Sequence, residues 1–344
     1  MLTIVVIFLW AAILLYMVTG GADFGAGIVE LFTVSVNRKQ LRGFMSRAMG
    51  PIWEANNMWL IIAIVILFVG FPSSYSFMST YLYIPLTGVL LGIIGRGTAF
   101  AFRNNDAVID KLQLVYNFIY ITSSILTPFC LGLVAASLFS GTIDPEGKSF
   151  ADVFVFGWLN WFTISVGLFT VALCGNLASL YMIGDADNGP DRFKYVKTAA
   201  GFTIITLILA VSVYMIAKNF RIVIFKEVMA QTIGLIGVVL AIVSFITMWV
   251  SILRKRTVWI RILVGFQVFV LQAFLFWHRF PTIIVTKSGL KFTVFDPLVQ
   301  PMTIHILGIA LLAGGLVILP SLIYLIFVFE WHIGDREKQP FKSD

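Results

Sequence analysis

Three carboxylates lie inside or next to the apolar stretches of this chain, where charged groups are costly. Asp23 and Glu30 are seven residues apart within the first stretch, and Glu54 lies near the start of the second. An ionisable side chain in hydrocarbon costs roughly a few kcal/mol, so each one is a candidate for function by default. A carboxylate at the edge of such a stretch can take a proton from water and pass it inward. These residue types therefore favour proton transfer.

The first two carboxylates belong to segment 20–30, GGADFGAGIVE. In a helix, Asp23 and Glu30 are two turns apart, about 10 Å along one face, so this face can hold a short acidic relay. Gly21 and Gly25 form a GxxxG step, which lets another helix backbone approach closely. The alternative is that the glycines are a packing notch and that both carboxylates pair with arginine or backbone groups.

The strongest pattern is segment 50–60, GPIWEANNMWL, in which Pro51 suits the first turn of a helix. We expect Glu54 to lie about one turn into the membrane and to hand protons inward. The alternative is that it satisfies first-turn amides and the helix dipole. The polar and aromatic residues that flank it on the same or the adjacent strip of the helix are Trp53, Asn56, Asn57 and Trp59.

Two arginines, Arg96 and Arg103, follow at the end of the third apolar stretch. We expect Arg96 to extend to the membrane interface, as long basic side chains near helix ends do. Pairing with an acid, or with a lipid or cofactor carboxylate, is the alternative. Amide side chains elsewhere in the apolar stretches are expected to join helices by hydrogen bonds. These amides are Asn117, Asn160, Asn176, Gln267 and Gln272.

Composition indicates which elements position these groups. Hydrophobic residues make up 59% of the 344 residues and charged residues only 12%, about half the usual share. A helix needs roughly 20 apolar residues to cross a bilayer, so the composition excludes a water-soluble domain and predicts a polytopic membrane protein. Basic cytoplasmic loops explain the net charge of +7, which requires no nucleic-acid partner.

Nine apolar stretches are long enough to cross a membrane, which predicts an all-α fold in one integral membrane domain, residues 1–344. The expected spans are residues 2–34, 51–70, 78–101, 113–140, 153–183, 195–217, 229–253, 258–280 and 302–329. An outside N-terminus and a cytoplasmic C-terminus put most Lys and Arg residues in cytoplasmic loops. Short loops favour two four-helix bundles with one peripheral helix. Segment 281–301 is expected to be a loop on the outer surface.

Histidine is scarce, and its positions argue against haem binding by this chain. His278, His305 and His332 fall near the ends of expected helices, and no two are placed as a buried axial pair on facing spans. Cys130 and Cys174 lie far apart in apolar stretches and are interpreted as packing residues. We therefore expect no haem and no metal to be ligated here.

These motifs resemble subunit II of the cytochrome bd quinol oxidases. The resemblance rests on segment 19–27, TGGADFGAG, and on segment 50–61, GPIWEANNMWLI. The RGTAFAFR pattern at 96–103, the length and the nine expected spans agree with it across most of the chain. It implies a heterodimer in which a similarly folded subunit I carries two b-type haems, haem d and the quinol site.

The resemblance also implies roles for residues of this chain. Glu54 matches the family's acidic residue implicated in proton delivery, Trp53, Asn56 and Trp59 match its companions, and Asp23 matches the second acid of the first motif. Gly20 stands where the family often has another Asp, so a relay here must be shorter or water-filled. The chain is expected to support subunit I and to supply a cytoplasmic proton path, and a route for oxygen, without being catalytic alone.

Expected partners are subunit I, small single-helix accessory subunits and membrane lipid, with quinol and oxygen as substrates of the complex. The expected location is a bacterial-type cytoplasmic membrane. A proton- or cation-coupled transporter that uses Asp23, Glu30 and Glu54 is the main alternative, although its paired, broken helices have no convincing counterpart in the second half of the chain. A purely structural subunit is the third hypothesis.

Overall fold

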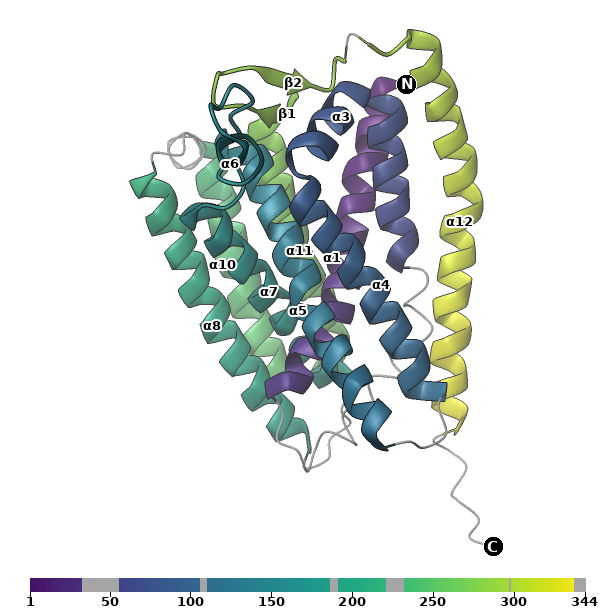
Figure 1. Cartoon of the computed structure of the whole chain (residues 1–344). Coiled ribbons are helices and arrows are strands. Elements are labelled where there is room, and N and C mark those ends of the chain that lie inside the picture. The colour runs from purple at the N-terminus through teal and green to yellow at the C-terminus, as the bar shows by residue number, and fades with distance from the viewer. Residues whose placement is uncertain (33–55, 106–109, 186–190, 221–231, 297, 337–344) are drawn as a thin grey trace, which may run out of the picture.

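A computed structural model describes residues 1–32, 56–105, 110–185, 191–220, 232–296 and 298–336. Long helices stand side by side along one direction, with a small hairpin over one end (Figure 1). The helices are α1 (Leu2–Phe32), a helix at Asn56–Gly70, α3 (Pro72–Tyr81), α4 (Tyr83–Asn105), α5 (Asp110–Ser140), α6 (Phe150–Phe154), α7 (Trp161–Asp185), α8 (Asp191–Asn219), α10 (Thr232–Leu253), α11 (Thr257–Arg279) and α12 (Pro301–Arg336). The hairpin strands are β1 (Thr282–Val285) and β2 (Lys291–Thr293).

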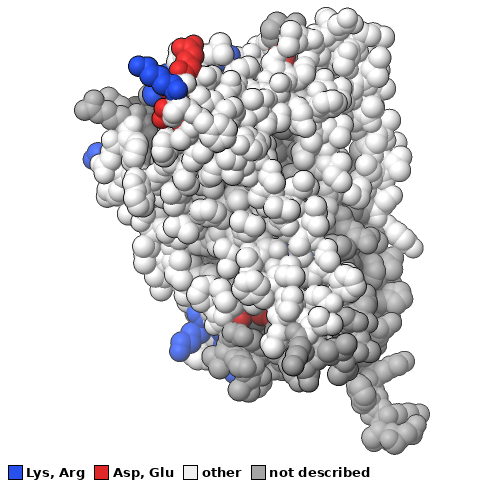
Figure 2. Space-filling view, in the orientation of Figure 1, with Lys and Arg blue, Asp and Glu red and all other residues white. Residues whose placement is uncertain are grey.

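The described residues contain eight helices that are long and apolar enough to cross a membrane. Helix Asn56–Gly70 and α3 together form a ninth candidate span, bent by 114° at its break. Figure 2 shows the charged side chains of the visible face gathered toward the two ends of the molecule, with a band almost free of visible charge between them. We call the end where α1 begins the N-terminal end. The predicted all-α polytopic class is confirmed, while the orientation in the membrane stays a prediction.

Two expected spans begin later than the apolar pattern predicts. The span expected at 78–101 is broken at Leu82, whose φ of −114° and ψ of 21° are not helical, so α3 ends and α4 begins there. The span expected at 153–183 begins only at Trp161. Its start is fixed by Asn160, whose Oδ1 accepts a hydrogen bond from Thr163 N at 3.0 Å. Asn160 therefore caps a helix instead of joining two helices, because its carbonyl satisfies a free first-turn amide.

Helix α1 is central, because it contacts α5, α7, α11 and α12. The GxxxG step lets α7 come very close: a Cβ on Gly25 would lie 1.9 Å from the backbone oxygen of Cys174. Three predicted interhelical amide bonds are present, and one of them runs from Gln267 Nε2 to Met248 Sδ at 3.7 Å. Asn176 Oδ1 accepts from Thr203 Oγ1 at 2.8 Å, and Gln272 Nε2 donates to Trp10 O at 3.0 Å. The division into two four-helix bundles stays a prediction.

The segment expected as a surface loop, 281–301, contains the antiparallel hairpin β1–β2, in which Val285 pairs with Lys291. Two ties hold it to the loop after α5. Lys287 Nζ lies 2.8 Å from Asp144 Oδ2, and Lys287 N donates to Ile143 O at 2.9 Å. The β-branched residues of this segment thus pair as strands, whereas only a surface loop was expected from the sequence.

The close approach of α1 and α7 makes Gly25 sensitive to size. We expect Gly25→Ala to destabilise the protein by about 1–3 kcal/mol, because the new methyl group meets backbone that cannot rotate away. Thermal unfolding of the purified complex measures this. Gly201→Ala is the matched control, since nothing lies within 4 Å of its Cβ position. Equal melting temperatures for the two variants would contradict the packing.

The tie between Asp144 and Lys287 should depend on pH. The Lys287 ammonium donates to Asp144 and holds the pKa of that carboxyl below its usual value, while Asp144 raises the pKa of Lys287. The stability that Asp144 contributes through this pair is therefore fully present above the ordinary pKa of an aspartate. It is lost as the pH falls through the lowered pKa of Asp144. The stability that Lys287 contributes is fully present below the ordinary pKa of a lysine. It is lost only as the pH rises through the raised pKa of Lys287.

We expect Asp144→Asn to speed amide hydrogen exchange in segment 286–290 at neutral pH, because the hairpin loses this tie. The difference from the unmodified chain should shrink as the pH is lowered through the Asp144 titration. Exchange followed by mass spectrometry, corrected for the intrinsic effect of pH, checks both statements. Glu146→Gln, an exposed change in the same loop, should leave the segment unaltered at every pH.

Candidate functional site

Two of the predicted acids and two arginines form a ladder of ion pairs between α1 and α4. Arg96 Nη2 lies 2.7 Å from Asp23 Oδ1, and Arg103 Nη2 lies 3.0 Å from Glu30 Oε2. Each pair of like residues is seven positions apart, so the two rungs repeat after two helical turns. Because Asp23 pairs with Arg96 and Glu30 with Arg103, the two helices run in the same direction. We call these four residues the ion-pair ladder.

Arg96 is the most fully engaged member of the ladder. Its Nε donates to Asp23 Oδ2 at 3.1 Å, so the pair is bidentate, and its Nη atoms also donate to Ser124 Oγ and to the backbone oxygen of Asp23. The residue is only 2% exposed. The expectation that Arg96 extends to the interface is therefore wrong, and the alternative of pairing with an acid is right. A buried guanidinium requires such a partner because desolvating an unpaired charge costs far more.

Tyr120 of α5 lies between the two rungs of the ladder. Its hydroxyl accepts a hydrogen bond from Arg96 Nη2 at 3.1 Å. Its ring centroid is 4.6 Å from the Cζ atom of Arg96 and 4.5 Å from that of Arg103. The ring face is electron-rich, so stacking on it stabilises both cations and separates them. Tyr120 thus connects both ion pairs to a third helix.

Glu30 forms the rung nearer the end of α1. The residue is 1% exposed, and its carboxylate faces Arg103. Arg103 Nη1 has no hydrogen-bond partner among the described residues. Arg103 thus has one nitrogen in this rung that no described residue bonds, whereas in the first rung the carboxylate of Asp23 is bonded to two nitrogens of one guanidinium.

Asn56 occupies the space beside Gly20. The Thr19 hydroxyl donates to Asn56 Oδ1 at 2.9 Å. A Cβ on Gly20 would lie 2.8 Å from that same oxygen, so a side chain at this position would have to displace the amide. The second span thus supplies a neutral polar group at the position where the resemblance led us to look for an acid.

The remaining predicted residues lie apart from the ladder. Asn57 and Trp59 are half-buried on helix Asn56–Gly70. Glu54 and Trp53 lie outside the described residues. Sequence reasoning missed Tyr120 and Ser124, although polar residues four positions apart within an apolar stretch mark one helix face. It also did not compare the spacing of Asp23 and Glu30 with that of Arg96 and Arg103. Both spacings are seven residues, and this match is the sequence signal for the ladder.

The residues whose side chains are described do not fit a resident metal ion. Within them there is no group of three or more His, Cys, Asp or Glu side chains that could hold one. His278 Nδ1 is 3.2 Å from Phe274 O of its own helix, and His305 is exposed near the start of α12. The absence of haem ligation by this chain stays a prediction.

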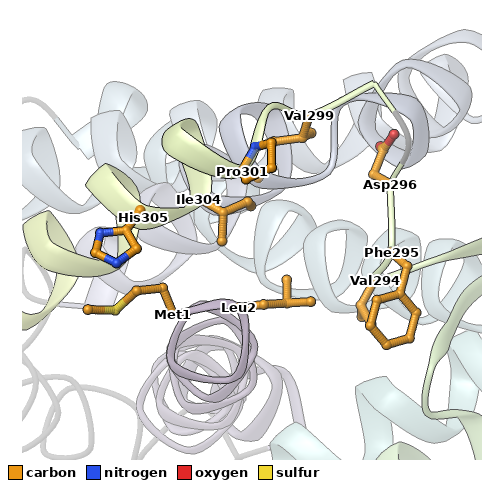
Figure 3. A pocket seen from close by; sticks show the side chains of 10 residues that line it. Met1, Leu2, Val294, Phe295, Asp296, Val299, Pro301, Ile304 and His305 are labelled. Atoms are coloured by element: carbon orange, nitrogen blue, oxygen red, sulfur yellow. The ribbon is translucent and has the colours of Figure 1, made fainter.

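A cavity of about 340 Å³ lies at the N-terminal end, between the starts of α1 and α12 (Figure 3). Its labelled side chains are mostly apolar, with Asp296 and His305 as the polar ones. The Asp296 carboxylate already accepts from Ser73 N at 2.8 Å and from Ser73 Oγ at 2.7 Å. The cavity adjoins Met1 and Leu2, whereas the ladder uses the second half of α1, so the two are separate features.

The ladder should make Asp23 essential for stability. We expect Asp23→Asn to destabilise the protein by about 3–5 kcal/mol, because it leaves the buried Arg96 charge without its partner. Thermal unfolding of the purified complex measures this. The double variant Asp23→Asn with Arg96→Gln should lose less than the single variant, and Asp144→Asn, in an exposed pair, should change little. An Asp23→Asn variant as stable as the unmodified chain would contradict a buried ion pair.

Two known proteins are similar to this chain in sequence. The chain is 27% identical over 331 residues to "Cytochrome bd ubiquinol oxidase subunit 2" of Bacillus subtilis, covering 93% of each chain. It is 24% identical over 170 residues to "Cytochrome bd-I ubiquinol oxidase subunit 2" of Escherichia coli K12, which is 48% of this chain and 44% of that one.

The fold is similar to that of the bd oxidase from Geobacillus thermodenitrificans, with a TM-score of 0.77 and 19% identity over 95% of this chain and 98% of that chain. The family model of cytochrome bd terminal oxidase subunit II matches residues 1–329. The protein is therefore a multi-pass membrane protein that belongs to the family of cytochrome bd terminal oxidase subunit II.

Proposed function

We propose that this chain is the subunit of a quinol:oxygen oxidoreductase that ligates no haem, supports a haem-bearing subunit I and supplies protons to the haems. The observation that carries the proposal is the ion-pair ladder, which crosses the second half of α1 in a member of this family. Charged side chains in membrane spans are rare and costly, and they are candidates for proton or ion paths by default. The two b-type haems and haem d, expected on subunit I, would carry electrons from quinol to oxygen and provide the oxygen-binding site.

The contacts suggest different roles for the three acids. Asp23 is bonded to two nitrogens of Arg96 and acts as a fixed charge beside the path. Glu30 pairs with Arg103, whose Nη1 has no hydrogen-bond partner among the described residues, and it carries the next charge along the path. Glu54 takes protons from water, with Asn56 as the amide that continues the path toward Thr19 and Gly20. Reduction of one oxygen molecule to water consumes four protons, which such a path delivers.

We place the N-terminus outside and the end opposite it in the cytoplasm of a bacterial-type cytoplasmic membrane. This orientation is supported by the exposed basic residues at the turn between α10 and α11 and at the start of α8. Protons taken from that side make the reaction electrogenic. Quinol and oxygen are substrates of the complex, oxygen follows a route through apolar packing, and small single-helix subunits complete the assembly.

The proposal predicts that Glu54→Gln slows quinol-dependent oxygen consumption by about tenfold or more, because an amide cannot relay a proton. An oxygen electrode measures the rate, and the reduced-minus-oxidised spectrum of the same complex measures its haem content. Glu146→Gln, an exposed acid at the N-terminal end, is the control and should be neutral. A Glu54→Gln complex with full haem content and full rate would favour a purely structural subunit.

A further inference from the structure

Basic side chains from three helices meet at the end of the bundle opposite the N-terminal end. Lys194 and Lys197 lie in the first turns of α8, and Arg254, Lys255 and Arg256 connect α10 to α11. All five side chains are exposed. Figure 2 shows Lys and Arg atoms gathered at the lower left of the visible face. We call these five residues the basic rim.

Packing fixes the helix ends that carry the basic rim. Arg192 Nη2 donates to Ile252 O at 3.3 Å, which ties the start of α8 to the end of α10. Further into the bundle from this bond, Ala199, Met248 and Ile260 belong to one buried apolar cluster. The rim charges are therefore held near one another by the fold, and like charges so held attract a counter-charge.

The turn between α10 and α11 is unusual in both charge and conformation. Arg254, Lys255 and Arg256 form no ion pair with any residue whose side chain the structure describes. Lys255 has a φ of 56°, the left-handed conformation in which a helix usually places Gly or Asn after its last turn. A lysine there is conformationally unfavourable, so the turn carries a third adjacent cation at some cost to its own stability.

Large apolar side chains project from the same helix ends. Phe193 is 76% exposed, Leu253 is 80% exposed and Trp259 is 52% exposed. Aromatic residues are typical of the boundary between headgroups and acyl chains, where one end of the ring is apolar and the other is wet. A surface with cations at one level and apolar groups beside them complements a molecule with an anionic head and hydrocarbon chains.

We propose that the basic rim, together with Phe193, Leu253 and Trp259, is a binding site for an anionic phospholipid of the adjacent leaflet. The rim cations contact the phosphate, and the exposed apolar side chains contact the first carbons of the acyl chains. Basic residues next to the membrane surface attract anionic lipid additively. This site rests on the membrane-spanning fold and is independent of the proposed proton path.

Photoreactive phosphatidylglycerol and photoreactive phosphatidylcholine test the site. Each is added to the purified oxidase complex in nanodiscs, and labelled peptides are mapped by mass spectrometry. We expect phosphatidylglycerol to label segments 191–198 and 253–260 and phosphatidylcholine to label them weakly. The variant Arg254→Gln, Lys255→Gln, Arg256→Gln should lose phosphatidylglycerol labelling by about tenfold. Equal labelling by the two lipids, or unchanged labelling of the variant, would overturn the proposal.

Two further variants separate lipid binding from folding. The control carries Lys148→Gln, Lys218→Gln and Lys291→Gln, which remove three exposed lysines away from the rim, and it should label as the unmodified chain does. Lys255→Gly removes one rim charge and suits the left-handed conformation. It should reduce labelling without lowering the thermal stability of the complex. If Lys255→Gly and the rim variant Arg254→Gln, Lys255→Gln, Arg256→Gln were both labelled fully, the site would not depend on charge. This conclusion does not depend on the rate of oxygen consumption.

Discussion

The guanidinium of Arg96 is the constraint on which the arrangement of the first half of the chain depends. It is a permanent charge in the interior of an apolar bundle, so it must be fully neutralised and hydrogen-bonded. Asp23 supplies the charge from α1, and Ser124 and Tyr120 supply oxygen atoms from α5. Satisfying this one group therefore brings three helices together and fixes their rotation, because each helix must present one particular face to it.

The glycines of α1 make this arrangement possible. A Cβ on Gly27 would lie 2.6 Å from Ser124 Cβ, and a Cβ on Gly25 would collide with the backbone of α7. Hydrogen bonds between helices require short distances between their backbones, which small residues permit. The glycine-rich segment of α1 is thus both a packing surface and the reason that polar side chains from α5 reach Arg96. The sequence allowed segment 20–30 to be either a packing notch or a site for polar groups, and in the structure it is both.

The sequence was sufficient to predict features that depend on the composition of one segment or on spacing within it. Apolar length identified the spans, and the spacing of Asp23 and Glu30 placed them on one helix face. It was insufficient where two distant segments decide the outcome. Arg96 was expected at the interface because its own helix does not reveal that Asp23 faces it. Asn160 was expected between helices because an apolar run does not show where a helix begins, whereas the amide of Thr163 needs a cap there.

The ladder also explains why Gly20 and Asn56 belong together in this chain. Asp23 and Glu30 carry two negative charges, and Arg96 and Arg103 carry two positive charges, so these buried rungs are balanced. A further carboxylate at position 20 would have no arginine of the ladder left to pair with and would displace Asn56. A neutral amide keeps hydrogen-bonding capacity at that place without adding charge. Both arginines of the ladder are already committed to Asp23 and Glu30.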